Sequence, residues 1–220
     1  GSGELRWEPL LGATIESELS GFDPGYFFPD FPGALSGKLD ASGERDAQGH
    51  WKGDARLVGL RGSLRRRPVQ GQARVQFAAD SANGELSLRI GNSHVEAGGR
   101  YGEQLDLHAQ FSPLDLADLW PGASGRLQGR MAVRGARIAP AYEAALRGEG
   151  LRWGQFAARQ LSARGRLPAS GRNGDLQLSA KDLSLSGETF DSAALTMTGS
   201  VAAFHATVNL ASGLGRLDFE

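Results

Sequence analysis

Apolar and polar residues alternate along most of the chain, in short runs that end at glycine. In one such run Ala73, Val75 and Phe77 alternate with Arg74 and Gln76. A period of two places apolar side chains on one face of a β-strand and polar side chains on the other. Glycines between such runs are typical of hairpin turns. The pattern therefore predicts an all-β chain with about fifteen strands in one continuous, mainly antiparallel sheet.

One stretch, FSPLDLADLWPGASGRLQGRMAVRG, interrupts the alternation with a short helical pattern. Leu116, Leu119 and Trp120 would share one face of this helix, and Asp115 and Asp118 would lie off it. The Pro-Gly pair that follows ends the helix, and alternation then resumes. We expect the three apolar side chains to pack against the sheet or to form a lid on its end, with an interfacial membrane anchor as the alternative. The acid at the start of the helix is interpreted as a cap that favourably meets the helix dipole.

A weaker copy of this stretch occurs earlier in the chain, so residues 22–43 and 111–135 are interpreted as two strand–helix repeat units. No change of composition separates them, which predicts a single elongated domain over residues 3–220. The first two residues, Gly1-Ser2, are interpreted as a cloning scar. The chain is therefore expected to be a fragment of a larger protein, with anchors and targeting signals outside it.

One face is apolar in nearly every predicted strand, and such a face must be covered by a second sheet, by closure or by curling. A repeated unit stacks into an elongated body more readily than into a globule. We therefore expect an open sheet that folds lengthwise into a trough with a hydrophobic interior, of a width suited to acyl chains. An ordinary β-sandwich remains the alternative.

The residues expected to line this groove are the apolar members of the alternating runs. They are Val75, Phe77, Leu86, Leu88, Ile90, Leu105, Leu107, Leu127, Met131, Val133, Leu146, Leu176, Leu178, Leu195, Met197, Val208 and Leu210.

Composition limits the function classes. The 24 basic and 25 acidic side chains nearly cancel, so no global field recruits nucleic acid. Cysteine is absent, so no disulfide or thiolate metal site can hold the fold. No apolar run approaches the ~18 residues that a membrane-spanning helix needs. The 32 glycines indicate many turns.

Candidate chemistry is sparse. The four histidines are far apart and have no metal-ligand spacing; they are His50, His94, His108 and His205. Surface positions are therefore expected for them, with no metal site. No nucleophile, phosphate-binding or redox motif occurs, so the sequence predicts no enzyme, no catalytic residue and no cofactor.

Two local clusters leave alternatives open. The basic run Arg65-Arg66-Arg67, followed by proline, is interpreted as a solvated turn, with contact to anionic headgroups as the alternative. The densest aromatic cluster spans residues 26–31 and holds one tyrosine and three phenylalanines. It is interpreted as a plug in the trough, with a lipid entry point as the alternative.

Three segments together resemble the C-terminal part of the TamB family, within the AsmA-like group of bridge-like lipid transfer proteins of Gram-negative envelopes. They are FSPLDLADLWPGASGRLQG, GEGLRWGQFAARQLSARGRL and DLQLSAKDLSLSGETFDSAALTMTGS. The resemblance implies a periplasmic protein with a taco-shaped β-sheet, folded lengthwise around a hydrophobic interior. It further implies an inner-membrane anchor and an outer-membrane barrel partner, TamA, both engaged by parts of the parent protein outside this chain.

These patterns and the resemblance lead to one main hypothesis, a hydrophobic groove that conducts phospholipid between the inner and outer membranes by holding its acyl chains. The resemblance links the same role to outer-membrane protein assembly and autotransporter secretion. The alternative hypothesis is a chaperone-like platform that binds unfolded outer-membrane proteins at exposed strand edges. A passive spacer with a dry, closed core is a third.

Overall fold

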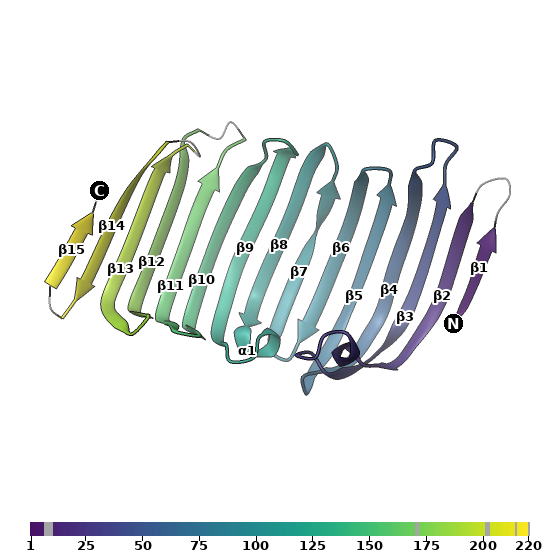
Figure 1. The fold of residues 1–220 in the computed structure, drawn as a ribbon, viewed down its shortest axis with the longest axis horizontal. Helices are drawn as coiled ribbons and strands as arrows, with labels where there is room; N and C mark the ends of the chain where they lie inside the picture. Colours follow the sequence, from purple (N-terminus) through teal and green to yellow (C-terminus); the bar gives the residue numbers. More distant parts are fainter. Residues whose placement is uncertain (7–10, 170–171, 201–202, 214, 220) are drawn as a thin grey trace. The chain divides into compact units, whose positions relative to one another are not determined.

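The structure, a computed structural model, describes residues 1–6, 11–169, 172–200, 203–213 and 215–219. In this part of the chain every regular element is a β-strand, apart from one four-residue α-helix and one 3-10 turn. The fifteen strands form one open antiparallel sheet, and neighbours in the sheet are neighbours in the chain, from β1 to β15 (Figure 1). The prediction of an all-β chain with about fifteen antiparallel strands and short helices is confirmed.

Contacts between residues divide the chain into two compact units, Gly1–Leu107 and His108–Glu220. The N-terminal unit holds β1 (Ser2–Arg6), β2 (Gly12–Phe22), the 3-10 turn η1 (Pro24–Tyr26), β3 (Gly33–Arg45), β4 (Trp51–Leu64), β5 (Arg67–Ala78), β6 (Ser81–Ile90) and β7 (Ser93–Tyr101). The unit boundary falls within β8 (Gln104–Asp115).

The C-terminal unit holds α1 (Leu116–Leu119), β9 (Ser124–Ala136), β10 (Ala141–Trp153), β11 (Phe156–Leu167), β12 (Gly174–Leu185), β13 (Glu188–Gly199), β14 (Phe204–Ser212) and β15 (Gly215–Phe219).

Tight hairpin turns account for the strand order. Arg65 and Arg66, between β4 and β5, have φ angles of 51° and 65°. Ser186 and Gly187, between β12 and β13, have φ angles of 53° and 94°. Two consecutive left-handed residues form a turn whose twist matches that of antiparallel strands. Each strand therefore pairs with the next one along the chain.

The register gives each unit one apolar and one polar face, because residues that pair across strands share a face. Between β5 and β6, Ala73 pairs with Leu86, whereas the next residue along, Arg74, pairs with Glu85 on the other face. The same separation runs through the C-terminal unit, where Leu178 of β12 pairs with Leu195 of β13.

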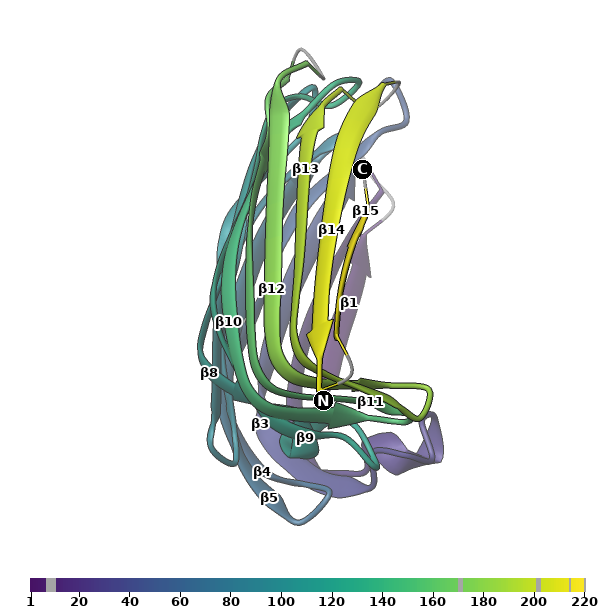
Figure 2. The ribbon, with the colours of Figure 1, turned by 90° about the vertical axis from the view of Figure 1, so that its left-hand side faces the viewer.

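Four neighbouring strands of the C-terminal unit interrupt their alternation in the same place. Each has two consecutive exposed residues there: Glu149-Gly150 in β10, Arg159-Gln160 in β11, Lys181-Asp182 in β12 and Asp191-Ser192 in β13. The register aligns them, since Glu149 pairs with Gln160, Gln160 with Lys181 and Lys181 with Ser192. The strands turn a corner near this row, as Figure 2 shows for β10, β11 and β12.

Left-handed residues make this corner. Gly150 has a φ of 59° and Asp182 a φ of 48°. Arg159 Nε donates to Asp182 Oδ2 across the row. Strict alternation after Gly148 would place residue 150 on the apolar face, but the extra residue at the corner places Leu151 there instead. Leu151 is buried, with 5% of its surface exposed. The corner therefore bends the sheet without moving its apolar side chains to the polar face.

The N-terminal unit has β-bulges similar to the register shift between Glu149 and Arg152 in β10. The register shifts between Leu19 and Phe22 in β2 and between Leu57 and Leu60 in β4. Each shift contains a left-handed glycine, Gly21 with a φ of 63° or Gly59 with a φ of 61°. A bulge adds one residue to one strand and increases the local bend.

Few apolar side chains of the described residues are buried. They are Val69, Ile90, Leu105, Leu114, Ala123, Leu151, Ala158 and Ala180. Several lie near strand ends or at the corner. Between these places the apolar face of each unit is half-buried or exposed.

Candidate functional site: the apolar face of each unit

The apolar face of the N-terminal unit contains five predicted groove residues in two paired strands. Val75 and Phe77 lie on β5, and Leu86, Leu88 and Ile90 lie on β6. The register puts all five on one face. Val75 and Leu86 each have 38% of their surface exposed, whereas Ile90 has 6%. On β8 the side chain of Leu105 is buried and that of Leu107 is half-buried.

The apolar face of the C-terminal unit contains the other ten predicted groove residues. They are Leu127, Met131, Val133, Leu146, Leu176, Leu178, Leu195, Met197, Val208 and Leu210, and the register brings all of them to one face. Met131 has 45% of its surface exposed. The alternation in the sequence was sufficient to assign these residues to a common face, because β9 to β14 pair without a register shift over these positions.

This face is hollowed near the end of the strands away from the corner, with a volume of about 460 Å³. Apolar side chains surround the hollow: Met131, Val133, Tyr142, Ala144, Leu167, Leu176, Met197 and Phe204. Glycines occupy its floor, since Gly174 pairs with Gly199, which pairs with Phe204. Leu167 reaches over Gly174, with Cδ1 2.8 Å from the place that a β-carbon on Gly174 would occupy, so a larger residue there would collide with the lining.

Tyr142, Leu167 and Phe204 line the hollow but are absent from the predicted groove residues. Tyr142 and Phe204 have 49% and 58% of their surface exposed. The signal that could have found them is the pairing of Gly174 in β12 with Gly199 in β13. That pairing follows from strand register, which the sequence alone did not fix.

The opposite face is polar and contains several ion pairs. In the N-terminal unit Lys52 Nζ lies 2.8 Å from Glu44 Oε1, and this hydrogen bond raises the pKa of Lys52. Lys38 Nζ lies 3.1 Å from Asp40 Oδ1, which likewise raises the pKa of Lys38.

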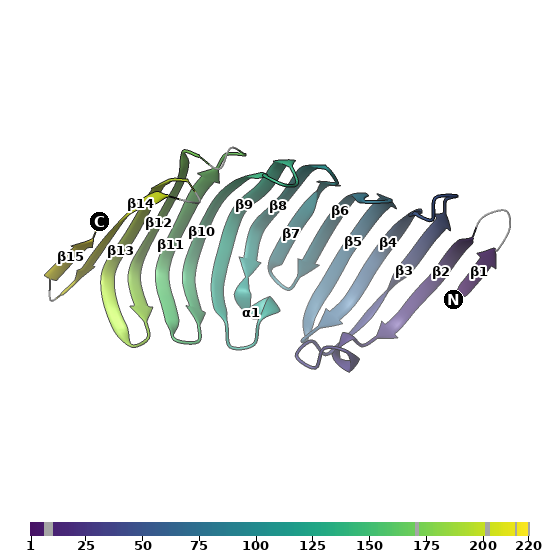
Figure 3. The same cartoon turned by 45° about the horizontal axis from the view of Figure 1, so that its top comes forward.

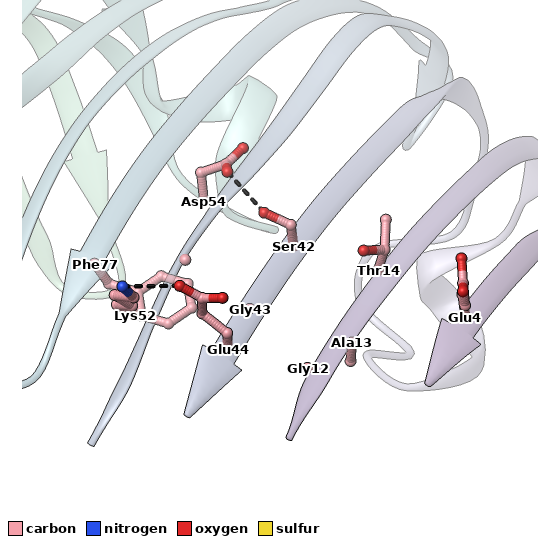
Figure 4. A pocket seen from close by; sticks show the side chains of 11 residues that line it. Glu4, Gly12, Ala13, Thr14, Ser42, Gly43, Glu44, Lys52, Asp54 and Phe77 are labelled. Atoms are coloured by element: carbon pink, nitrogen blue, oxygen red, sulfur yellow. Dashed lines mark hydrogen bonds and ion pairs between the residues drawn. The ribbon is translucent and has the colours of Figure 1, made fainter. Parts of the chain in front are cut away.

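A shallow hollow of about 490 Å³ lies among the polar side chains of the N-terminal unit. Figure 4 shows Glu4, Thr14, Ser42, Lys52 and Asp54 projecting from neighbouring strands there. Ser42 Oγ donates to Asp54 Oδ1 at 2.8 Å. Ala13 and Phe77 also line this hollow, so its lining is mixed polar and apolar.

The short helix α1 begins after Asp115, whose carboxylate accepts a hydrogen bond from the backbone N–H of Ala117 at 3.1 Å. The prediction that Asp115 caps the helix is confirmed. Leu116 and Leu119 are half-buried, whereas Trp120 has 47% of its surface exposed.

Asp118 differs from the prediction. The sequence placed it off the apolar face of α1, but its side chain is fully buried. A helix of four residues makes barely one turn, so the helical period does not decide which residues face the protein. None of the helices in the described ranges is long and apolar enough to span a bilayer.

The remaining polar candidates lie at the surface. His50, His108 and His205 are exposed, and His94 is half-buried with Nε2 3.4 Å from Glu96 Oε1. Within the described ranges no group of three or more potential ligands could hold a metal ion. Arg65 and Arg66 form the tip of the β4–β5 turn, as the sequence predicted.

The fold and this face define a class of protein, one with a single antiparallel sheet whose apolar face carries exposed side chains. A family model described as "TamB, N-terminal domain" matches residues 1–220. The chain belongs to the TamB family, as the sequence resemblance indicated. The matched part is the N-terminal domain, so the expected correspondence to the C-terminal part of the family is wrong.

Among curated proteins the chain is similar to the "Translocation and assembly module subunit TamB" of Haemophilus influenzae. The two are 26% identical over 188 residues, which cover 84% of this chain and 14% of the relative. The chain thus spans about a seventh of the length of that relative. No solved structure matches the chain.

Proposed function

We propose that the apolar face binds the acyl chains of phospholipids and that the protein is a section of a conduit for phospholipid between two membranes. The observation that carries this proposal is an apolar face without a covering layer among the described residues. Strands contact mainly their neighbours in the sheet, α1 contacts β9 and η1 contacts β3. Soluble proteins rarely expose a continuous apolar patch of more than a few hundred Å², so such a face has a ligand or partner.

Acyl chains fit the chemistry of this face. The hollow in the C-terminal unit is lined by hydrocarbon, thioether and aromatic groups, and its volume of about 460 Å³ lies in the usual range for ligand pockets. Each methylene group buried there contributes about 0.8 kcal/mol. Leucine, valine and other apolar side chains line the apolar face of both units, and the two methionines lie in the C-terminal unit, so a lipid tail can move from strand to strand without a deep trap.

The wider role is proposed for the parent protein. Membership of the TamB family and the name of the Haemophilus relative support a place in an envelope module for translocation and assembly. We place the chain in the periplasm, between an inner-membrane anchor and the outer-membrane barrel TamA, which parts of the parent protein outside this chain would engage. In this role the chain binds lipid and performs no catalysis.

A matched pair of substitutions in β12 tests the proposal. Leu178 lies on the apolar face and pairs with Leu195, whereas its neighbour Gln177 pairs with Thr196 on the polar face. Leu178→Asp places a charge among the acyl chains, and Gln177→Asp places the same charge in water. Purified variants with unchanged circular dichroism are extracted, and the bound phospholipid is quantified by mass spectrometry.

We expect Leu178→Asp to lose most of its phospholipid and Gln177→Asp to keep it. Equal phospholipid in the two variants contradicts the proposal. Binding of unfolded outer-membrane proteins, with no phospholipid in either variant, supports the strand-edge platform instead.

A further inference from the structure

The loop between β2 and β3 holds aromatic side chains in an exposed position. We call residues 23–32 the aromatic loop. Tyr26, Phe27 and Phe28 have 87%, 64% and 66% of their surface exposed. Phe27 contacts Tyr26 edge-to-face at 5.3 Å between ring centroids, and it stacks on Phe22 at 6.2 Å. The cluster therefore projects from the sheet, and the sequence-based interpretation as a plug does not describe it.

Hydrogen bonds hold the aromatic loop in this form. Asp23 Oδ1 accepts from the backbone N–H groups of Gly25, at 2.8 Å, and Gly33, at 2.7 Å. One carboxylate thus joins the two ends of the loop. Inside it, the N–H of Phe28 donates to Pro24 O at 2.9 Å, and the N–H of Phe31 donates to Phe28 O at 2.8 Å. Because its backbone groups are bonded internally, the loop presents its aromatic rings at little cost in conformational entropy.

The structure brings the arginine run next to this loop. The backbone N–H of Arg65 donates to Pro32 O at 2.7 Å, and Gly33 pairs with Leu64. Figure 3 shows the loop beside the ends of β4 and β5. Arg66 and Arg67 are exposed. The turn that contains the three arginines therefore lies beside the loop that contains the three exposed aromatic residues, although the two segments are far apart in the sequence.

The charges at this place favour an anionic surface. The aromatic loop contains two acids, Asp23 and Asp30, and the β4–β5 turn contains three arginines, so the formal charge of the two segments together is +1. The carboxylate of Asp23 already binds two backbone N–H groups. Aromatic residues prefer the headgroup level of a bilayer, and basic residues are attracted to anionic headgroups. A surface with both features matches the chemistry of an anionic bilayer.

We propose that the aromatic loop and the β4–β5 turn form a docking surface for a membrane that contains anionic phospholipid. The rings of Tyr26, Phe27 and Phe28 enter the headgroup region, and Arg66 and Arg67 contact lipid phosphates. This inference is independent of acyl-chain binding, because these residues lie at the end of the strands, outside the predicted groove residues.

The absence of cysteine allows a direct test, since a single introduced thiol can be labelled specifically. A polarity-sensitive fluorophore is attached at Phe28→Cys and, as a control, at Gln72→Cys on the polar face of β5. Each labelled chain is mixed with vesicles of phosphatidylcholine alone or of phosphatidylcholine with phosphatidylglycerol. We expect a blue shift only at position 28 and only with phosphatidylglycerol. No shift at that position, or equal shifts at both positions, overturns the proposal.

A charge-matched comparison separates docking from general attraction. Arg66→Gln/Arg67→Gln removes two charges from the turn, and Arg74→Gln/Arg89→Gln removes two exposed charges from the polar face. Vesicle flotation should show binding weakened roughly tenfold to thirtyfold in the first variant and within about twofold of the parent in the second. Equal weakening in both contradicts a localised surface.

The groove substitution Leu178→Asp tests whether acyl-chain binding and membrane docking use separate sites. It should lose bound phospholipid but still float with anionic vesicles. Loss of flotation in this folded variant overturns the separation of the two sites. If only the comparison of the arginine variants fails, the docking surface is refuted and acyl-chain binding is unaffected.

Discussion

The side chain of Leu151 lies over Gly148, with Cδ1 only 2.5 Å from the place that a β-carbon on Gly148 would occupy. Both residues belong to β10, on either side of the corner at Gly150, and both lie on the apolar face. The contact shows that the alternation skips one position there and that the strand folds its leucine back over its own glycine. The corner therefore depends on a missing side chain at residue 148.

Gly148→Ala tests this dependence. The added methyl group would overlap Leu151, which is buried and cannot leave without exposing apolar surface, so we expect a loss of about 1–3 kcal/mol in unfolding free energy. Gly43→Ala is the matched control, because its β-carbon would make an ordinary contact of 3.6 Å with Trp51. Urea unfolding of both variants measures the difference. In the Leu151→Ala background, Gly148→Ala should cost less unfolding free energy than in the parent chain. An equal cost in both backgrounds shows that the contact with Leu151 is not its cause.

Filling the apolar hollow should exclude lipid without unfolding the sheet. Ala144 lines the hollow, and its neighbour Ala145 lies on the polar face opposite Arg130. We expect Ala144→Trp to lower bound phospholipid by roughly fivefold, equivalent to about 1 kcal/mol, because the indole occupies the space of a lipid tail. Ala145→Trp adds the same volume on the other face. Mass spectrometry of extracted lipid measures the phospholipid bound by each variant. An equal effect of both substitutions refutes the assignment of the hollow as the place of a lipid tail.

The turn between β3 and β4 should loosen in acid. Asp46 Oδ1 accepts from the N–H groups of His50, at 2.8 Å, and Gln48, at 2.9 Å, and the bond from His50 is the main cause that lowers the pKa of Asp46 below 3.8. A lowered carboxyl pKa stabilises the turn above pH 3.8, and this contribution is lost as the pH falls through the folded-state pKa.

Amide chemical shifts of Gln48 and His50, followed by NMR during acid titration, report this change. We expect a midpoint below 3.8 for both amides. A midpoint at or above that value shows that the carboxylate does not hold the turn.

The sequence predicted the sheet well, because alternation with a period of two is a local property. Val75 and Phe77 share a face whatever strand lies beside them. The same reasoning assigned Leu178 and Leu195 to one face, and the register then paired them directly. The glycine-bounded runs predicted antiparallel strands, whereas the choice between an open sheet and an ordinary β-sandwich stayed open in the sequence.

The corner could not be predicted, because it is a departure from alternation. Lys181 and Asp182 are consecutive exposed residues between Ala180 and Leu183, and only the register aligns them with Glu149 and Gly150 in β10. Three-residue spacings between apolar residues were visible in the sequence. Such a spacing indicates a corner only when neighbouring strands have the same spacing at paired positions, and the sequence does not give this pairing.

Burial of Asp118 and the contact between two distant loops were also beyond the sequence. A one-turn helix has no periodic face, so burial depends on what lies beside it. The N–H of Arg65 reaches Pro32 O only because β3 and β4 pair. Long-range neighbours of this kind follow from the fold and not from local pattern.

Photo-crosslinking tests most directly whether the apolar face holds lipid. A photoreactive residue is placed at Met131 or Leu178 on the apolar face and, as controls, at Gln128 or Gln177 on the polar face. After irradiation of the chain in cells, mass spectrometry identifies the adducts. We predict phospholipid adducts from positions 131 and 178 and none from positions 128 and 177. Adducts only with protein, or phospholipid equally from both faces, would contradict the account.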